Sequence, residues 1–261
     1  MPKGGVSMGM RSVVGGVCAW ALIGVLAAAG TGAACGGEDG PEAGTVEMIE
    51  LMSSDGLPMR AEVRWGGKTW LLLGHMFTAD LRAWDPIAKD FHARGYSVLA
   101  WDFRGHGETP QFANIPEELR AAELHREWRA ALDYAEAAGA ERIYGAGASM
   151  GGTSLAVTAA MEAAEDDRLD GMILISAPTV FRGLDALAAY AAVAIPRLII
   201  VGVDDRSAPT FARLFHRDAA GPSKLVELPT NLHGNALTSD EEFGPQVLEL
   251  MQEFLPEADA R

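Results

Sequence analysis

From residue 45 onward, short apolar runs alternate with longer stretches whose apolar residues recur at helical spacing. The runs at 69–73, 96–101 and 170–176 have the length and the nearly continuous apolar character of strands that are buried on both faces. The stretches at 81–94 and 115–138 are typical of helices. Strands that alternate with helices predict an α/β fold, in which helices cover both faces of a mostly parallel sheet. We expect about eight strands in this sheet.

Two further segments define the limits of this domain. The runs at 46–52 and 59–65 flank Ser-Ser-Asp-Gly, a turn sequence, so we expect them to form an antiparallel hairpin. Only about twenty residues, 177–196, separate two of the later strands, and this length leaves no room for a large lid domain. Residues 45–261 are therefore predicted to form one domain.

The N-terminal segment differs in composition from the rest of the chain. Lys3 and Arg11 provide a positive flank, and residues 12–34 are Val, Ala, Gly and Leu-rich and carry no charge. This pattern is typical of an export signal, so residues 1–34 are predicted to be a signal peptide and 35–44 a flexible linker. A membrane anchor that is retained is the alternative, because the apolar run approaches the length that a bilayer requires.

Cys35 directly follows three small residues, Gly-Ala-Ala. This arrangement resembles a bacterial lipobox, in which the cysteine thiol is diacylated and the cysteine becomes the new N-terminus. The resemblance implies that the chain is exported and lipid-anchored through Cys35 at the cell envelope, on the periplasmic or cell-surface side. Secretion without a lipid stays open as a second alternative.

Charge and cysteine content exclude several functions. The formal net charge is −15 and no cluster of Lys and Arg offsets it, so binding to nucleic acid is not expected. The chain has two cysteines, of which Cys18 lies in the predicted signal peptide. Removal of that segment would leave no intrachain disulfide and no metal site built from cysteines. The sequence contains no phosphate-binding loop, metal-ligand cluster or dinucleotide motif, so no metal and no cofactor are predicted.

The motif G-x-S-x-G occurs at residues 147–151, between a predicted strand and a predicted helix. Such a tight turn from strand to helix holds the central residue in a strained conformation that only small neighbours tolerate. Ser149 is therefore the candidate nucleophile. A serine that merely caps the helix after a glycine turn would also match the motif.

A serine nucleophile needs a base and an orienting carboxylate later in the chain. Of the two histidines that follow Ser149, His216 falls on a predicted helix, whereas His233 falls in the loop before the last helix. His233 is therefore the candidate base. Asp204 and Asp205 both lie at the end of the strand predicted at 197–203, where the acid is required. The spacing from the preceding glycine and the following proline favours Asp205, with Asp204 as the alternative.

These residues, together with two further segments, resemble the α/β-hydrolase superfamily over roughly residues 45–256. Residues 71–77 are similar to the strand that ends in His-Gly-X, although Met76 stands in place of the glycine. Residues 95–107 are similar to the strand and D-x-R-G-x-G turn of that superfamily. The resemblance implies an α/β-hydrolase fold, and an oxyanion hole formed by the backbone N–H groups of Met150 and Phe77.

The resemblance also implies structural roles for four residues near the site. His75 and His106 are expected to make hydrogen bonds in turns, and Asp102 and Arg104 are expected to pair with each other and hold their turn.

A serine nucleophile leads to acyl transfer through an acyl-enzyme, so the expected partner is a small acyl substrate. A site without a lid favours hydrolysis of carboxylic esters or thioesters. An acyltransferase or a peptidase would use the same three residues. From a different class, a non-catalytic binding lipoprotein on this fold is also an alternative, because fold alone does not imply function.

Overall fold

The computed structural model describes residues 41–110, 121–164 and 168–258. The predicted signal peptide, the lipid attachment at Cys35 and most of the linker lie outside these residues. These described residues form one compact unit. No helix in the described part of the chain has the length and apolar character needed to cross a membrane.

The core of the domain is an eight-stranded sheet in the order β1-β2-β4-β3-β5-β6-β9-β10. The strands β1 and β2 form the expected antiparallel hairpin, β2 pairs antiparallel with β4, and all later pairs are parallel. The prediction of an α/β-hydrolase fold with a mostly parallel sheet of about eight strands is therefore confirmed. The bounds of these strands are β1 Val46–Met52, β2 Pro58–Arg64, β3 Thr69–Gly74, β4 Ser97–Trp101, β5 Arg142–Ala148, β6 Gly171–Ile175, β9 Arg197–Gly202 and β10 Ser223–Leu228.

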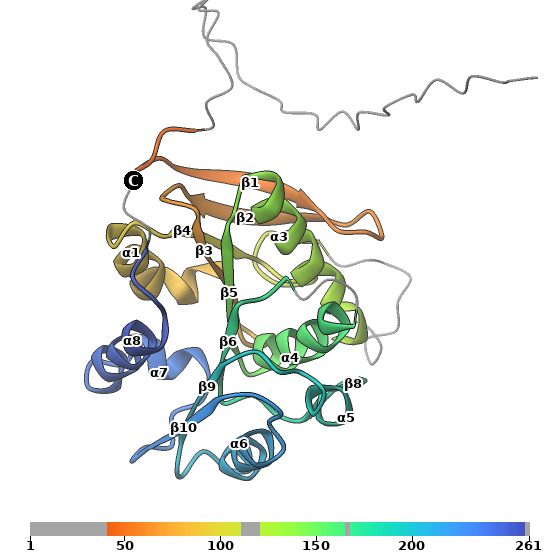
Figure 1. Cartoon of the computed structure of the whole chain (residues 1–261), viewed down its shortest axis with the longest axis vertical. Helices are drawn as coiled ribbons and strands as arrows, with labels where there is room; N and C mark the ends of the chain where they lie inside the picture. The colour runs from red at the N-terminus through yellow and green to blue at the C-terminus, as the bar shows by residue number, and fades with distance from the viewer. Residues whose placement is uncertain (1–40, 111–120, 165–167, 259–261) are drawn as a thin grey trace, which may run out of the picture. The chain divides into compact units, whose positions relative to one another are not determined.

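Helices cover both faces of the sheet (Figure 1). The helices α1, α7 and α8 pack on one face, and α3, α4, α5 and α6 pack on the other. Their bounds are α1 Asp85–Ala93, α3 His125–Ala137, α4 Met150–Ala163, α5 Leu187–Tyr190, α6 Ala208–Arg217, α7 Asn235–Ser239 and α8 Phe243–Phe254. Short 3₁₀ turns at Leu81–Trp84 and Ala121–Glu123 precede α1 and α3. The first part of the helical stretch expected over 115–138 lies outside the described residues.

The apolar runs of the sequence supply both faces of the sheet at once. Along β3, Leu72 belongs to the core under α3 and α4, whereas Leu71 and Leu73 belong to the core under α1 and α8. Successive side chains of a strand point to opposite faces, so a continuous apolar run is what a sheet covered on both sides requires.

The segment between β6 and β9 contains no large lid domain. It holds a small hairpin of β7 (Val180–Phe181) and β8 (Leu184–Asp185), followed by α5. The sequence did not predict this hairpin. The edge of the sheet at which β5, β6 and β9 end is thus left accessible.

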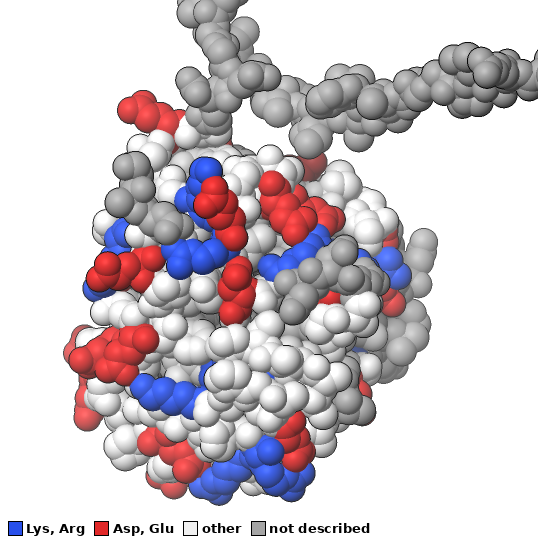
Figure 2. Space-filling model, in the orientation of Figure 1, with Lys and Arg blue, Asp and Glu red and all other residues white. Residues whose placement is uncertain are grey.

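Charged side chains on the surface lie close to charges of the opposite sign. Figure 2 shows Lys and Arg interspersed with Asp and Glu over the visible face. Lys224 and Glu253, for example, form an ion pair of 2.9 Å, and Arg213 and Glu227 one of 2.6 Å. Pairs exposed in this way contribute little to stability, but they neutralise most of the positive side chains.

Candidate active site

Ser149 lies in the turn between β5 and α4, as the motif predicted. Its φ angle is 47°, a left-handed conformation that is costly for any residue with a side chain. Neighbouring backbone comes so close that a Cβ at Gly147 would lie 2.5 Å from the Gly151 carbonyl oxygen, and one at Gly151 would lie 2.2 Å from the Gly74 oxygen. The glycines of the motif are therefore required by packing around Ser149.

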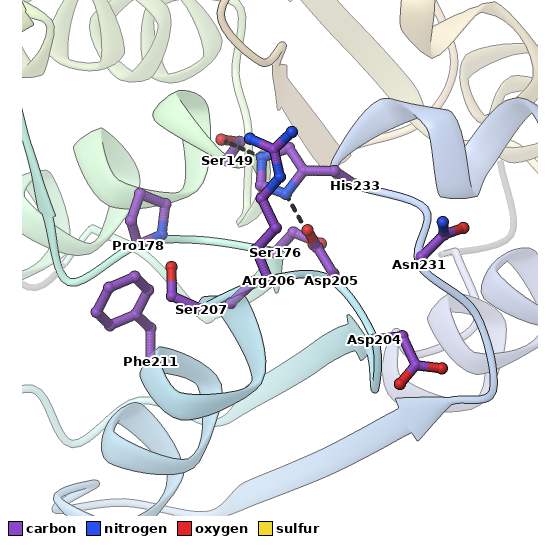
Figure 3. A pocket seen from close by; sticks show the side chains of 11 residues that line it. Ser149, Ser176, Pro178, Asp204, Asp205, Arg206, Ser207, Phe211, Asn231 and His233 are labelled. Carbon is purple, nitrogen blue, oxygen red and sulfur yellow. Dashed lines mark hydrogen bonds and ion pairs between the residues drawn. The ribbon is translucent and has the colours of Figure 1, made fainter.

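Three side chains from separate strand ends form a continuous hydrogen-bonded chain (Figure 3). The His233 Nε2 and Ser149 Oγ atoms are 2.7 Å apart, and His233 Nδ1 is 2.7 Å from Asp205 Oδ2. Ser149 follows β5, Asp205 follows β9 and His233 follows β10. Parallel strands end at one edge of the sheet, so residues 84 and 28 positions apart in sequence meet there.

The carboxylate of Asp205 determines how the imidazole can act. A carboxylate only accepts hydrogen bonds, so Nδ1 of His233 donates to Asp205. Nε2 is then left to accept the hydroxyl proton of Ser149. Asp205 is 5% exposed, whereas the side chain of His233 is 44% exposed and accessible to a substrate. Asp205 is thus the aspartate that binds His233, and the carboxylate of Asp204 points away from both of these side chains (Figure 3).

The loop after β3 packs directly against the turn that holds Ser149. Gly74 pairs with Gly147 in the sheet, and a Cβ at Gly234 would lie within 3.5 Å of both Met76 and the Ser149 Cβ. The N–H of Met76 donates to Asn235 Oδ1 (2.9 Å), and the Met76 carbonyl accepts from His75 Nδ1 (2.7 Å). Both ends of Met76 are therefore held in place.

The peptide between Met76 and Phe77 gains a defined orientation from these bonds. In a trans peptide the carbonyl and the N–H point in opposite directions, so a fixed Met76 carbonyl also fixes the direction of the Phe77 N–H. The assignment of the N–H groups of Met150 and Phe77 as oxyanion donors stays a prediction, and this orientation supports it.

His75 is buried and uncharged. Its Nε2 accepts from the backbone N–H of Phe103 (3.0 Å) while Nδ1 donates to Met76, so both ring nitrogens are engaged in one tautomer. Burial lowers the pKa of His75 to about 3, and a backbone bond to Met76 opposes this only in part. Burial also lowers the pKa of His106. Both histidines make backbone hydrogen bonds in turns, which is the kind of role that the resemblance implied.

The expected pair of Asp102 and Arg104 is not formed, so this prediction was wrong. Asp102 accepts from the backbone N–H groups of Leu81 and Glu108, each at 2.8 Å. Arg104 instead pairs with the buried Glu127 and with Asp55, the latter at 3.1 Å. The physical reason is that each oxygen of Asp102 already accepts from a backbone N–H, one in the 3₁₀ turn at Leu81 and one in its own turn, whereas Arg104 extends to carboxylates from other elements.

A cavity of about 560 Å³ opens beside Ser149 and His233. This volume lies within the range of sites for small ligands. Pro178 and Phe211 provide apolar surface in its wall, and Ser176, Arg206 and Ser207 provide polar groups (Figure 3). The space is therefore suited to a small molecule with both apolar and polar parts.

Three residues of this region were missed in the sequence. Asn235 holds Met76, and Ser176 and Arg206 line the cavity. For two of them the sequence offered a signal, namely closeness to a candidate site residue: Arg206 directly follows Asp205, and Asn235 lies two residues after His233. Among the described residues there is no group of three or more His, Cys, Asp or Glu side chains that could hold a metal ion.

Comparison with known proteins agrees with this architecture. Residues 68–192 match the family described as "Serine aminopeptidase, S33". This range includes Ser149, while Asp205 and His233 lie beyond it. A search of curated protein sequences found no match.

Several solved structures have the same fold. An esterase from Pyrococcus furiosus is 16% identical, with a TM-score of 0.65 over 80% of this chain and 93% of the other. An esterase from Exiguobacterium antarcticum is 14% identical, with a TM-score of 0.65 over 78% and 98%. A hydrolase from Pseudomonas aeruginosa is 19% identical, with a TM-score of 0.65 over 80% and 98%. At such low identity, these likenesses establish the fold alone.

Proposed function

We propose that this chain, which has the α/β-hydrolase fold, is a serine hydrolase that cleaves carboxylic esters or thioesters. The observation that carries the proposal is the hydrogen-bonded chain from Ser149 through His233 to Asp205, beside a cavity of about 560 Å³. The distance of 2.7 Å between Ser149 Oγ and His233 Nε2 allows proton transfer, and that of 2.7 Å between His233 Nδ1 and Asp205 Oδ2 lets the carboxylate orient the imidazole.

In the first half of the reaction, Ser149 Oγ attacks the carbonyl carbon of the ester while His233 Nε2 takes the hydroxyl proton. The carbonyl oxygen gains negative charge, which the N–H groups of Met150 and Phe77 stabilise. The bond from carbon to the alcohol oxygen then breaks, and His233 gives the proton to the departing alcohol. The acyl group stays on Ser149.

In the second half, water attacks the acyl-enzyme and His233 accepts a proton from that water. The bond between the acyl carbon and Ser149 Oγ breaks, and the proton returns to Ser149. The net reaction converts ester and water into carboxylic acid and alcohol. Throughout both halves, Asp205 holds the tautomer of His233 and stabilises the imidazolium.

Labelling with a fluorophosphonate probe tests the nucleophile. We expect the wild-type protein to be labelled and to hydrolyse 4-nitrophenyl esters, and Ser149→Ala to lose both properties. Esters of graded acyl length then define the preferred chain length. Labelling or hydrolysis that persists in Ser149→Ala would contradict the proposal.

A peptidase is the second candidate, because the matching family is described as a serine aminopeptidase. An aminopeptidase must bind a positively charged amine near its nucleophile. Of the two carboxylates that line the cavity, Asp205 is bound to His233 and that of Asp204 points away from it. The guanidinium of Arg206, which also lines the cavity, would repel such an amine. Alanine 4-nitroanilide compared with 4-nitrophenyl butanoate separates the two activities, and we expect cleavage of the ester only.

An acyltransferase would pass the acyl group to an alcohol in place of water. Product analysis with and without added methanol tests this alternative. We expect the free acid to remain the main product when methanol is present at low concentration.

The export signal and the small residues before Cys35 support a location outside the cytoplasm, with Cys35 lipidated at the cell envelope. Mass spectrometry of the mature N-terminus tests this part of the proposal. A diacylated Cys35 is the expected result, and an unmodified N-terminus at another residue would contradict it.

A further inference from the structure

Arg206 differs from the other positive side chains of the described structure. Most of those side chains contact a carboxylate within 4.0 Å, as in the ion pairs of Arg213 and Arg217. Arg142 and Arg197 donate to backbone carbonyls, and Arg182 lies over the ring of Phe77. In residues 41–110, 121–164 and 168–258, no ion pair or hydrogen bond involves the guanidinium of Arg206. In a chain with 36 acidic residues, this absence is unusual.

The position of Arg206 makes its guanidinium available inside the site. Arg206 lines the cavity and directly follows Asp205 in the chain. Figure 3 shows its side chain among the residues that line the cavity, whereas the carboxylate of Asp204, which also lines the cavity, points away from His233. No ion pair joins the guanidinium to either neighbouring aspartate, and Asp205 instead accepts a hydrogen bond from His233.

The backbone at Arg206 is strained. Its φ angle is 42°, in the left-handed region that residues with a Cβ rarely adopt. Such strain persists where the surrounding structure imposes it, and it is concentrated at functional sites. A glycine would adopt this angle without strain, whereas an arginine at this position costs backbone energy.

A second polar group of the cavity also has no partner. Ser176 follows β6, is 1% exposed, and its hydroxyl makes no hydrogen bond to any described residue. Buried hydroxyl groups are normally hydrogen-bonded, so an unpaired one in the wall of a cavity points to a ligand group. Ser176 and Arg206 thus offer two unused donors in one space, with the apolar surfaces of Pro178 and Phe211 beside them.

We propose that this cavity takes esters that carry a carboxylate in addition to the scissile ester, and that Arg206 binds this carboxylate. The inference rests on the proposed function, and it specifies the substrate class. A guanidinium offers paired N–H donors that match the two oxygens of a carboxylate, and such charge-assisted pairs are stronger than neutral hydrogen bonds. The extra carboxylate can belong to the acyl part or to the alcohol part of the ester.

Two matched pairs of substrates test the proposal and distinguish these two sources. Mono-4-nitrophenyl adipate and 4-nitrophenyl hexanoate differ by a carboxylate on the acyl side. The compounds 4-carboxyphenyl butanoate and 4-carbamoylphenyl butanoate differ by a carboxylate on the alcohol side. We expect the wild-type kcat/KM to be about tenfold higher for the carboxylate member of one pair. This preference should shrink at about 0.5 M NaCl, where an exposed ion pair is screened.

Substitutions then assign the preference to Arg206. Arg206→Ala should abolish it, so that the ratio of kcat/KM for the anionic and neutral members of the pair falls from about ten to about one. Arg206→Lys should retain part of it, because lysine keeps the charge but not the paired donors. Arg213→Ala, which removes an exposed arginine of α6 away from the cavity, is the matched control and should retain it fully.

Two results would overturn the inference: equal rates for the members of both pairs in the wild type, or an Arg206→Ala variant that slows neutral and anionic esters equally. Hydrolysis of the neutral esters that depends on Ser149 would in either case leave the proposed function intact. Loss of that hydrolysis in the wild type would overturn both proposals.

Discussion

The turn after β4 and the turns after β5, β6 and β9 lie at the same edge of the sheet but differ in two respects. In the turn after β4, the left-handed positions are glycines, Gly105 and Gly107. In the other three turns, they are Ser149, Ser176 and Arg206, at φ angles of 47°, 51° and 42°. The first turn avoids backbone strain, and the other three retain it.

The polar groups of these turns differ in the same way. After β4, each oxygen of Asp102 accepts from a backbone N–H group, and Arg104 is held by Glu127 and Asp55. The hydroxyl of Ser176 and the guanidinium of Arg206 have no partner in the described part of the chain. The polar groups after β4 are thus paired within the fold, whereas the turns after β6 and β9 each present a group that the described residues leave unpaired, as the proposed binding of a ligand requires.

The largest effect is expected at the acid of the site. Asp205→Asn should lower kcat for 4-nitrophenyl butanoate by about four orders of magnitude, because an amide in place of the carboxylate favours the wrong imidazole tautomer. The melting temperature should change little. Asp204→Asn, one residue earlier, is the matched control and should keep wild-type kcat. Equal losses in both variants would show that the two aspartates share the role.

A substitution that disturbs the turn after β4 should lower stability and leave kcat unchanged. Glu127→Gln leaves the buried Arg104 with Asp55 as its remaining carboxylate, so we expect the free energy of unfolding to fall by about 3 kcal/mol. The kcat of the protein that remains folded should be unchanged. Urea unfolding, measured together with active-site titration, checks both statements. A lower kcat at unchanged stability would place Glu127 with the site instead.

His75 links the turn after β4 to the loop after β3, since it binds Phe103 on one side and Met76 on the other. Burial lowers its pKa from 6.5 to about 3, so between these values the unfolded chain binds a proton that the folded chain does not. Stability is therefore complete above the unfolded pKa and is lost as the pH falls below it. Between about pH 7.5 and pH 5, this group should account for about 2 kcal/mol of the loss.

Urea unfolding of wild type and His75→Gln at both pH values measures this contribution. The variant lacks the titrating ring, so its stability should decrease by about 2 kcal/mol less on acidification than that of the wild type. Parallel losses in the two proteins would show that His75 does not remain neutral in the folded state.

The smallest effect concerns the strain at Arg206. Arg206→Gly should raise the free energy of unfolding by about 1 kcal/mol, because glycine adopts the left-handed conformation without strain. Arg206→Ala keeps a Cβ and should give no such gain, although both variants lose the preference for anionic esters. If Arg206→Gly does not stabilise the protein, the left-handed angle of Arg206 costs no free energy, and the two kinds of turn do not differ in backbone strain.

The fold could be predicted from the sequence alone, and so could Ser149, Asp205 and His233, the three residues that the structure brings together. Alternating apolar runs and helical stretches predict strands and helices because each pattern is a local property of the chain. The motif around Ser149 likewise depends on the close approach of neighbouring glycines. With the order of acid and base known for such a site, few candidates for Asp205 and His233 remained.

Tertiary structure alone decided which polar groups find partners. Asn235 binds Met76 across 159 positions of the chain, and Arg104 reaches Glu127 and Asp55 in preference to Asp102. Nothing in the local sequence distinguishes Arg206, which has no partner among the described residues, from Arg213, which binds Glu227. The partner of a side chain depends on which elements the fold brings close to it. That closeness in space is not a property of any short stretch of sequence.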